Sequence, residues 1–119
     1  MKGLGTALIT PFTENGTIDY QALSTLIEYQ IAGQVDYLVV LGTTSEVPTL
    51  TLAEQDTIIS FVVKQVAGRV PLVLGVGGNS THAVVERIDE LRERLIADFA
   101  AILSVTPYYN RPQQEGLFQ

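Results

Sequence analysis

The sequence predicts an α/β protein in which strands and helices alternate and the strands form one parallel sheet. Its 119 residues contain four short apolar runs that recur at intervals of about 30 residues, the length of one strand and its crossover helix. The runs are apolar throughout rather than alternating, which is typical of parallel strands covered on both faces. Their centres are Leu8, Val39, Val73 and Ile102. Two architectures fit this pattern, a doubly wound open sheet and a (β/α)8 (TIM) barrel.

The first two strands enclose one predicted helix. Residues 7–9 form a short apolar run that a Thr-Pro pair ends, and residues 37–41 form a continuous run rich in β-formers. Between these runs, Asp19 is placed to cap a helix and Gly33 is placed to end it. The apolar residues of this segment follow helical spacing: Leu23, Leu26, Ile27 and Ile31.

Two more helices and two more strands are predicted in the second half. Residues 51–54, Thr-Leu-Ala-Glu, match a capping box, and Gly68 is expected to end the helix that follows. Residues 72–74 form the third strand and residues 100–105 the fourth. The third helix, between these strands, has a strongly charged face over residues 86–94, which we interpret as a solvated surface. Its apolar residues are Val84, Val85, Ile88, Leu91 and Leu95.

We expect residues 1–119 to form a single partial domain. No low-complexity tract or linker divides them, and residues 112–119 begin what is predicted to be a fourth helix. A (β/α)8 barrel takes about 250 residues, so four strands and three helices are about the N-terminal half of one. The sheet of such a half has two apolar edges without a partner strand.

Composition excludes several classes of protein. Seven basic against thirteen acidic residues, a net charge of −6, argue against a nucleic-acid surface. The chain has no cysteine and a single histidine, His82, so we expect no thiolate chemistry and no metal site. No apolar run approaches the ~20 residues of a membrane span, and the N-terminus does not resemble a secretory signal. These observations predict a soluble, cytoplasmic protein.

The chemistry is expected at the carboxyl ends of the strands, where parallel βα folds place their sites. The turn after the second strand, Gly42-Thr43-Thr44, offers two hydroxyls and free backbone N–H groups that could hold a small carboxylate. The alternative is a Ser/Thr turn that satisfies its own backbone. The glycines of residues 75–78 match no nucleotide-binding fingerprint and are better explained by a tight turn that keeps the rim open.

Two tyrosines and two lysines complete the candidate chemistry. Tyr108 and Tyr109 follow the fourth strand, where one phenol could relay protons or both could pack at an interface. At most one should face the site, because neighbours on an extended chain point in opposite directions. Lys2 precedes the first strand and Lys64 lies on the second helix, so neither can form an imine with a substrate at the rim.

Four segments, in order and at βα spacing, closely resemble dihydrodipicolinate synthase. They span essentially the whole chain: residues 5–12 (Gly-Thr-Ala-Leu-Ile-Thr-Pro-Phe), 42–46 (Gly-Thr-Thr-x-Glu), 69–77 (Arg-Val-Pro, then Gly-Val-Gly) and 106–117 (Thr-Pro-Tyr-Tyr-Asn-Arg-Pro-x-Gln-Glu-Gly-Leu). The related N-acetylneuraminate lyase usually has Ser at the position of Thr43 and differs after the fourth strand. Both features favour the synthase.

The resemblance implies a (β/α)8 class I aldolase that condenses pyruvate with aspartate semialdehyde through a Schiff base, in lysine and diaminopimelate biosynthesis. Such an enzyme needs no metal or organic cofactor and is usually a homotetramer, a dimer of dimers. By resemblance, Thr43 is the hydroxyl of a proton relay and Thr44 contacts the pyruvate carboxylate. Tyr109 is the relay tyrosine that reaches into the partner subunit's site.

The chain departs from the family pattern at several positions. The family's Schiff-base lysine and second relay tyrosine lie beyond Gln119, so we expect the 119 residues alone to be inactive. Ser45 stands where the family usually has Gly, which is tolerable if φ stays negative but adds a side chain at the rim. Before the fourth strand, residues 96–98 replace a helix-ending Gly.

A second departure concerns inhibition by lysine. Family members inhibited by lysine bind it at the dimer interface, near the residues matching Asn79 and Tyr108. They also use an acidic residue at the position of Ala83 and often His or Glu at that of Gln55. We therefore expect weak or absent inhibition.

Two other functions remain open at this level. The chain could be a non-catalytic half-barrel, natural or engineered, that self-associates or pairs with a complementary half. An open-sheet carboxylate-binding module is the third possibility, and only the Gly-Thr-Thr turn favours it.

Overall fold

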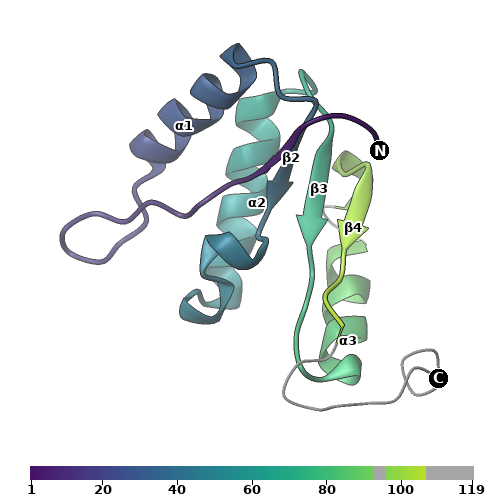
Figure 1. Ribbon diagram of the computed structural model, residues 1–119. Coiled ribbons are helices and arrows are strands. Elements are labelled where there is room, and N and C mark those ends of the chain that lie inside the picture. The colour runs from purple at the N-terminus through teal and green to yellow at the C-terminus, as the bar shows by residue number, and fades with distance from the viewer. Residues whose placement is uncertain (93–95, 107–119) are drawn as a thin grey trace.

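A computed structural model of the chain describes residues 1–92 and 96–106. Strands and helices alternate along it, as Figure 1 shows. The strands and α-helices are β1 (Gly5–Ala7), α1 (Tyr20–Ala32), β2 (Tyr37–Val40), α2 (Leu52–Val66), β3 (Leu72–Gly75), α3 (Thr81–Arg92) and β4 (Ala101–Leu103). Short 3-10 turns cover Thr43–Ser45, Val47–Thr49 and Ile96–Asp98. The expected helix at 112–119 lies outside the described residues.

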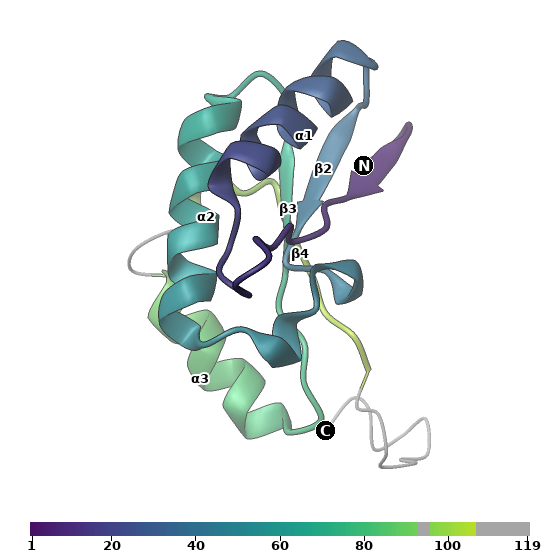
Figure 2. The same cartoon turned by 90° about the vertical axis from the view of Figure 1, so that its left-hand side faces the viewer.

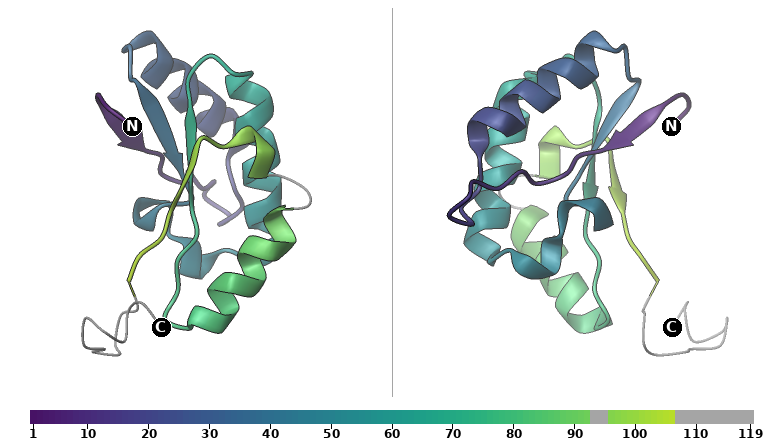
Figure 3. Two further views of the ribbon diagram at one scale, coloured as in Figure 1. Left: turned by 90° about the vertical axis from the view of Figure 1, so that its right-hand side faces the viewer. Right: turned by 60° about the vertical axis from the view of Figure 1, so that its left-hand side comes forward.

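The topology decides between the two predicted architectures. All neighbouring strands are parallel, and their order in the sheet is their order in the chain, β1-β2-β3-β4. A doubly wound sheet reverses direction part-way and carries helices on both faces. Here α1, α2 and α3 all lie on one face of the strands, as Figures 2 and 3 show from opposite sides. The chain therefore forms the N-terminal part of a (β/α)8 barrel.

The core lies between the sheet and these helices. Leu38 and Val40 of β2 point into it and are fully buried, whereas Val39 between them points to the opposite face and is half-buried. The helices contribute Leu23, Ile27, Ile59, Val62 and Val66. Full burial of each of these side chains stabilises the fold by about 1.5–3 kcal/mol.

The helix starts are those the sequence predicts. The Asp19 carboxylate accepts a hydrogen bond from the Ala22 N–H at 2.9 Å at the start of α1. At the start of α2, Thr51 and Glu54 exchange the two hydrogen bonds of a capping box. Helix α2 ends one residue earlier than predicted. Ala67, rather than Gly68, is its C-cap: it adopts the left-handed conformation (φ 49°) and donates its N–H to the Val63 carbonyl.

The first strand begins earlier than predicted. It runs over Gly5–Ala7 instead of 7–9, and Leu8 extends it only by donating its N–H to the Val39 carbonyl at 2.9 Å. The Leu8 carbonyl accepts from side chains instead of a neighbouring strand. A Cβ atom at position 5 would overlap the Tyr37 ring, so a larger residue than glycine there would require this side chain to move.

Two ion pairs join neighbouring helices. Arg69, just after α2, donates to both carboxylate oxygens of Glu28 on α1, at 2.6 and 2.8 Å. These hydrogen bonds, with one from the Gln65 amide, lower the pKa of Glu28 to about 2. Arg87 of α3 pairs with Asp56 of α2 at 2.5 Å and is only 15% exposed. The interpretation of 86–94 as a solvated face is therefore wrong at Arg87, which turns inward to meet this carboxylate.

Candidate functional site

The candidate site is built on the turn that follows β2. Leu41 leaves the strand in the left-handed conformation (φ 54°), and Gly42 leads into the 3-10 turn Thr43–Ser45. This geometry places three hydroxyl side chains in succession at the carboxyl end of the strand. As predicted, the hydroxyl-bearing turn lies at the end of the sheet where barrel sites are found.

The third hydroxyl, that of Ser45, does not point to the rim. It is 2% exposed and donates to the Leu8 carbonyl at 2.6 Å. In return, the Thr10 hydroxyl, 5% exposed, donates to the Ser45 carbonyl at 2.8 Å. The expectation of an added side chain at the rim is therefore wrong: Ser45 keeps a negative φ and its side chain fastens the turn to the end of β1.

Thr43 and Thr44 are both exposed. The Thr44 hydroxyl lies 3.3 Å from the same Leu8 carbonyl, a long hydrogen bond. The Thr43 hydroxyl has no hydrogen-bond partner among the residues that the structure describes. The alternative of a turn that satisfies its own backbone therefore fits none of the three hydroxyls, because Thr44 and Ser45 both donate to the carbonyl of Leu8, at the end of another strand.

A cavity of about 640 Å³ opens beside this turn. It joins the carboxyl ends of three strands, and its lining includes Thr43, Gly75, Gly77, Leu103 and Val105. Most of its wall is apolar, and Arg87 and Gln55 add polar groups on the side of α2 and α3. It has the mixed character of a small-molecule site, an apolar wall with a few polar groups.

Glycine is required at one point of this wall. A Cβ atom on Gly75 would collide with the carbonyl oxygen of Leu41 and lie 2.7 Å from its carbonyl carbon. The left-handed turn at Leu41 brings its backbone this close to β3. At Gly77, by contrast, a Cβ atom would make an ordinary contact at 3.5 Å with Val105.

The structure places the remaining predicted residues only in part. Asn79 is exposed in the loop between β3 and α3. Gln55 lines the cavity and donates from its amide to the Leu50 carbonyl at 3.3 Å, and Ala83 is exposed on α3. Tyr108 and Tyr109 lie outside the described residues.

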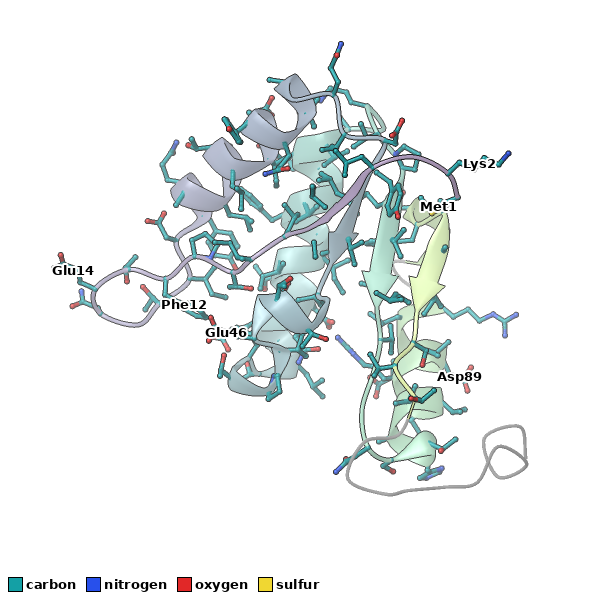
Figure 4. The ribbon with its side chains drawn as sticks, viewed as in Figure 1. Met1, Lys2, Phe12, Glu14, Glu46 and Asp89 are labelled. Carbon is teal, nitrogen blue, oxygen red and sulfur yellow. The ribbon has the colours of Figure 1, made fainter. Side chains whose placement is uncertain are left out.

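Neither lysine faces the cavity. Lys2 is exposed at the amino end of the sheet, far from Glu46, which follows the hydroxyl turn (Figure 4). Lys64 is exposed in the last turn of α2. Both lysines therefore lie where the sequence places them, Lys2 before the first strand and Lys64 on the second helix.

Within residues 1–92 and 96–106, no three His, Asp or Glu side chains gather as metal ligands would. No helix in these ranges is long and apolar enough to cross a membrane.

Sequence reasoning missed two features of the site. It identified Thr10 as part of the Thr-Pro pair that ends the first apolar run, and did not foresee that this hydroxyl is buried and bonded to the Ser45 carbonyl. It also treated Arg87 as a surface charge, although this residue lines the cavity. The one available signal was the position of Thr10, directly after the first strand.

Parallel strands in chain order, helices on one face and hydroxyls at the carboxyl rim define part of a (β/α)8 barrel with a candidate site at that rim. The chain belongs to the Dihydrodipicolinate synthetase family, which it matches over residues 1–119.

Relatives of known name and structure agree. The chain is 56% identical, over all of its length, to 4-hydroxy-tetrahydrodipicolinate synthase of Parabacteroides distasonis, and 45% identical over 98% of its length to that of Bacillus subtilis. It superposes over 99% of its length on the crystal structure of dihydrodipicolinate synthase from Aquifex aeolicus, with a TM-score of 0.86 and 44% identity. It spans about 39% of the length of each of these proteins.

Proposed function

We propose that this chain is the N-terminal part of a 4-hydroxy-tetrahydrodipicolinate synthase, a lyase that joins pyruvate and aspartate semialdehyde by a Schiff-base aldol condensation. The observation that carries the proposal is the Thr43 hydroxyl, which lies on the wall of the cavity without a partner among the described residues. A hydroxyl in that state is available to exchange a proton with a bound substrate. Its neighbour Thr44 is the natural partner for a carboxylate.

The proposed role of Thr44 is to bind the pyruvate carboxylate. Thr44 is exposed, and within the described part of the chain its hydroxyl makes only the 3.3 Å hydrogen bond to the Leu8 carbonyl. A carboxylate accepts a hydrogen bond more strongly than a neutral carbonyl does, so the Thr44 hydroxyl gains by donating to it instead. Binding of this end of pyruvate would leave its keto carbon free to react with an amine.

The proposed role of Thr43 is to relay protons during imine formation and aldol addition. Forming an imine requires a proton for the departing hydroxyl of the carbinolamine, and carbon–carbon bond formation leaves an alkoxide that takes one up. A hydroxyl that can both donate and accept serves both steps. In this proposal Tyr109, contributed from across the dimer interface, is the next member of the relay.

The amine that forms the imine is proposed to lie outside these 119 residues. Lys2 and Lys64 are both exposed and away from the cavity, whereas imine formation favours a desolvated amine at the site. The threonines described here would then complete the site of a lysine further along the barrel.

The proposed function also includes a place in metabolism and an oligomeric state. The product would feed lysine and diaminopimelate biosynthesis in the cytoplasm, and the enzyme would work as a homotetramer, a dimer of dimers, without an organic cofactor or metal. One similar structure, 39% identical over 98% of this chain, is described as the first monomeric dihydrodipicolinate synthase variant, which implies that association is usual among its relatives.

Inhibition by lysine is proposed to be weak. Asn79 and Tyr108 are candidate contacts for lysine at the dimer interface. Ala83 offers no carboxylate to its ammonium group, and the Gln55 amide is engaged with the Leu50 carbonyl. Inhibition of the full-length enzyme by sub-millimolar lysine would contradict this proposal.

Borohydride trapping with labelled pyruvate tests the function. The full-length protein should incorporate label, because borohydride reduces the imine to a stable amine, and the isolated 119-residue chain should not. Labelling of the isolated chain would place the amine at Lys2, Lys64 or the N-terminus and overturn the assignment.

Exposed apolar side chains favour a second candidate, a non-catalytic half-barrel that self-associates or pairs with a complementary half. Ile102, Leu103 and Val105 on and after β4 are 40–46% exposed. A compact dimer of the chain on size-exclusion chromatography, with no condensation activity from the full reading frame, would favour this candidate over the synthase.

A further inference from the structure

The buried hydroxyls of Ser45 and Thr10 form a reciprocal clasp between the first two strands. Ser45 donates from its side chain to the Leu8 carbonyl at 2.6 Å, and Thr10 donates from its side chain to the Ser45 carbonyl at 2.8 Å. Both residues are at least 95% buried, so water does not compete for these hydrogen bonds. The clasp therefore fixes the Thr43–Ser45 turn relative to the end of β1.

The clasp also determines what the Thr44 hydroxyl can do. Ser45 and Thr44 share the Leu8 carbonyl as acceptor, at 2.6 and 3.3 Å. Leu8 is buried, and a buried carbonyl without a donor is costly. With Ser45 in place, that carbonyl is already satisfied and makes little demand on Thr44.

We propose that Ser45 and Thr10 are positioning residues that keep the Thr44 hydroxyl available to a substrate carboxylate. The inference rests on the proposed function, in which Thr44 binds the carboxylate of a 2-keto acid. Without the Ser45 hydroxyl, Thr44 becomes the only side-chain donor to the Leu8 carbonyl among the described residues. Turning toward that carbonyl, it loses its hydrogen bond to the substrate.

A double-mutant cycle in the full-length protein tests the coupling. Ser45→Ala should raise the KM for pyruvate about tenfold, because a hydrogen bond to a charged group weakens. The KM for aspartate semialdehyde and kcat should stay within about twofold, since neither depends on this bond. Thr44→Val should raise the pyruvate KM at least as much.

The decisive variant combines both changes. If Ser45 acts through Thr44, adding Ser45→Ala to Thr44→Val leaves the pyruvate KM unchanged, a coupling of about the full tenfold effect. If Ser45 is merely structural, the two effects multiply and kcat falls with them, and the positioning role is overturned.

Thr10 supplies a matched pair that does not alter the turn itself. Thr10→Ser retains the donor and should keep the KM of the unaltered protein, whereas Thr10→Val replaces the hydroxyl with a methyl group and should raise the pyruvate KM. Equal KM values for these two variants would refute the role of Thr10, even if Ser45→Ala fails to fold.

The activity of the unaltered protein distinguishes a failure of the positioning role from a failure of the proposed function. If this protein condenses pyruvate with aspartate semialdehyde but shows no coupling between positions 44 and 45, only the positioning role is wrong. If the unaltered protein has no such activity, the proposed function fails and this inference fails with it.

Discussion

The two sides of the rim are built differently. On the side of β1 and β2, hydroxyls are fastened to backbone carbonyls by buried hydrogen bonds, through Thr10 and Ser45. On the side of β3 and β4, glycines and apolar side chains line the cavity. The first side therefore supplies a fixed turn that carries the Thr43 and Thr44 hydroxyls, and the second supplies space.

The difference teaches how one cavity can be both specific and open. Polar groups that are held before a ligand arrives lose little freedom when it binds. Glycines leave room for a substrate without adding polar groups that would need partners. The two sides meet where the left-handed turn at Leu41 brings its carbonyl against Gly75.

Disrupting the close approach of Gly75 to the Leu41 carbonyl is expected to have the largest effect on stability. Gly75→Ala places a methyl group against the Leu41 carbonyl, which belongs to the backbone and cannot rotate away. We expect a loss of at least about 3 kcal/mol in the free energy of unfolding, measured by chemical denaturation. Gly77→Ala is the matched control and should change it by less than about 1 kcal/mol, because its methyl group only touches Val105. Equal losses would show that the close approach at Leu41 is not the cause.

Removing the unpartnered hydroxyl should affect chemistry rather than stability. Thr43→Val is nearly isosteric, and the Thr43 side chain makes no hydrogen bond to another described residue. In the full-length enzyme we expect kcat to fall about 100-fold, the low end for loss of a proton-transfer group. The melting temperature should stay the same. A variant that melts earlier and keeps its kcat would assign Thr43 to the scaffold.

The smallest effect on stability is expected from the ion pair of Glu28 and Arg69, which contributes to neither side of the rim. The pKa of Glu28 is lowered from 4.5 to about 2, first by its hydrogen bond from Arg69 and then by that from Gln65. Because the folded value lies below the unfolded one, this carboxylate stabilises the fold above pH 4.5, and the stabilisation is lost as the pH falls toward 2.

Glu28→Gln should therefore lower the melting temperature slightly at pH 7, with the difference from the unaltered protein vanishing near pH 2. The pair is about half exposed, so solvent screens it and the effect should be small. The kcat of Glu28→Gln should equal that of the unaltered enzyme. A change in kcat would contradict the separation of helix pairing from the rim.

The sequence predicted most of the fold because its signals are local. Asp19 and Thr51 cap their helices by accepting a hydrogen bond from the backbone N–H of the residue three positions later. The position of the Gly-Thr-Thr turn was predictable because it follows an apolar strand in a βα repeat. The two lysines could also be placed, because Lys2 precedes the first strand and Lys64 lies on a helix, outside the sheet.

What could not be predicted depends on partners distant in the sequence. The Ser45 side chain turns inward because its hydroxyl donates to the Leu8 carbonyl, 37 residues away in the sequence. Arg87 is drawn from the surface by Asp56, on another helix. No local pattern records such pairings, because each depends on how two βα units pack together.

The order of the strands has a consequence for how this segment is made. Each strand after the first hydrogen-bonds to the strand synthesised immediately before it, about 30 residues earlier in the sequence. The chain loops that these pairings close are therefore short. Within the sheet that the structure describes, each unit can therefore dock on the preceding one as it emerges from the ribosome. The threonine turn can thus be in place while the remainder of the polypeptide is still being translated.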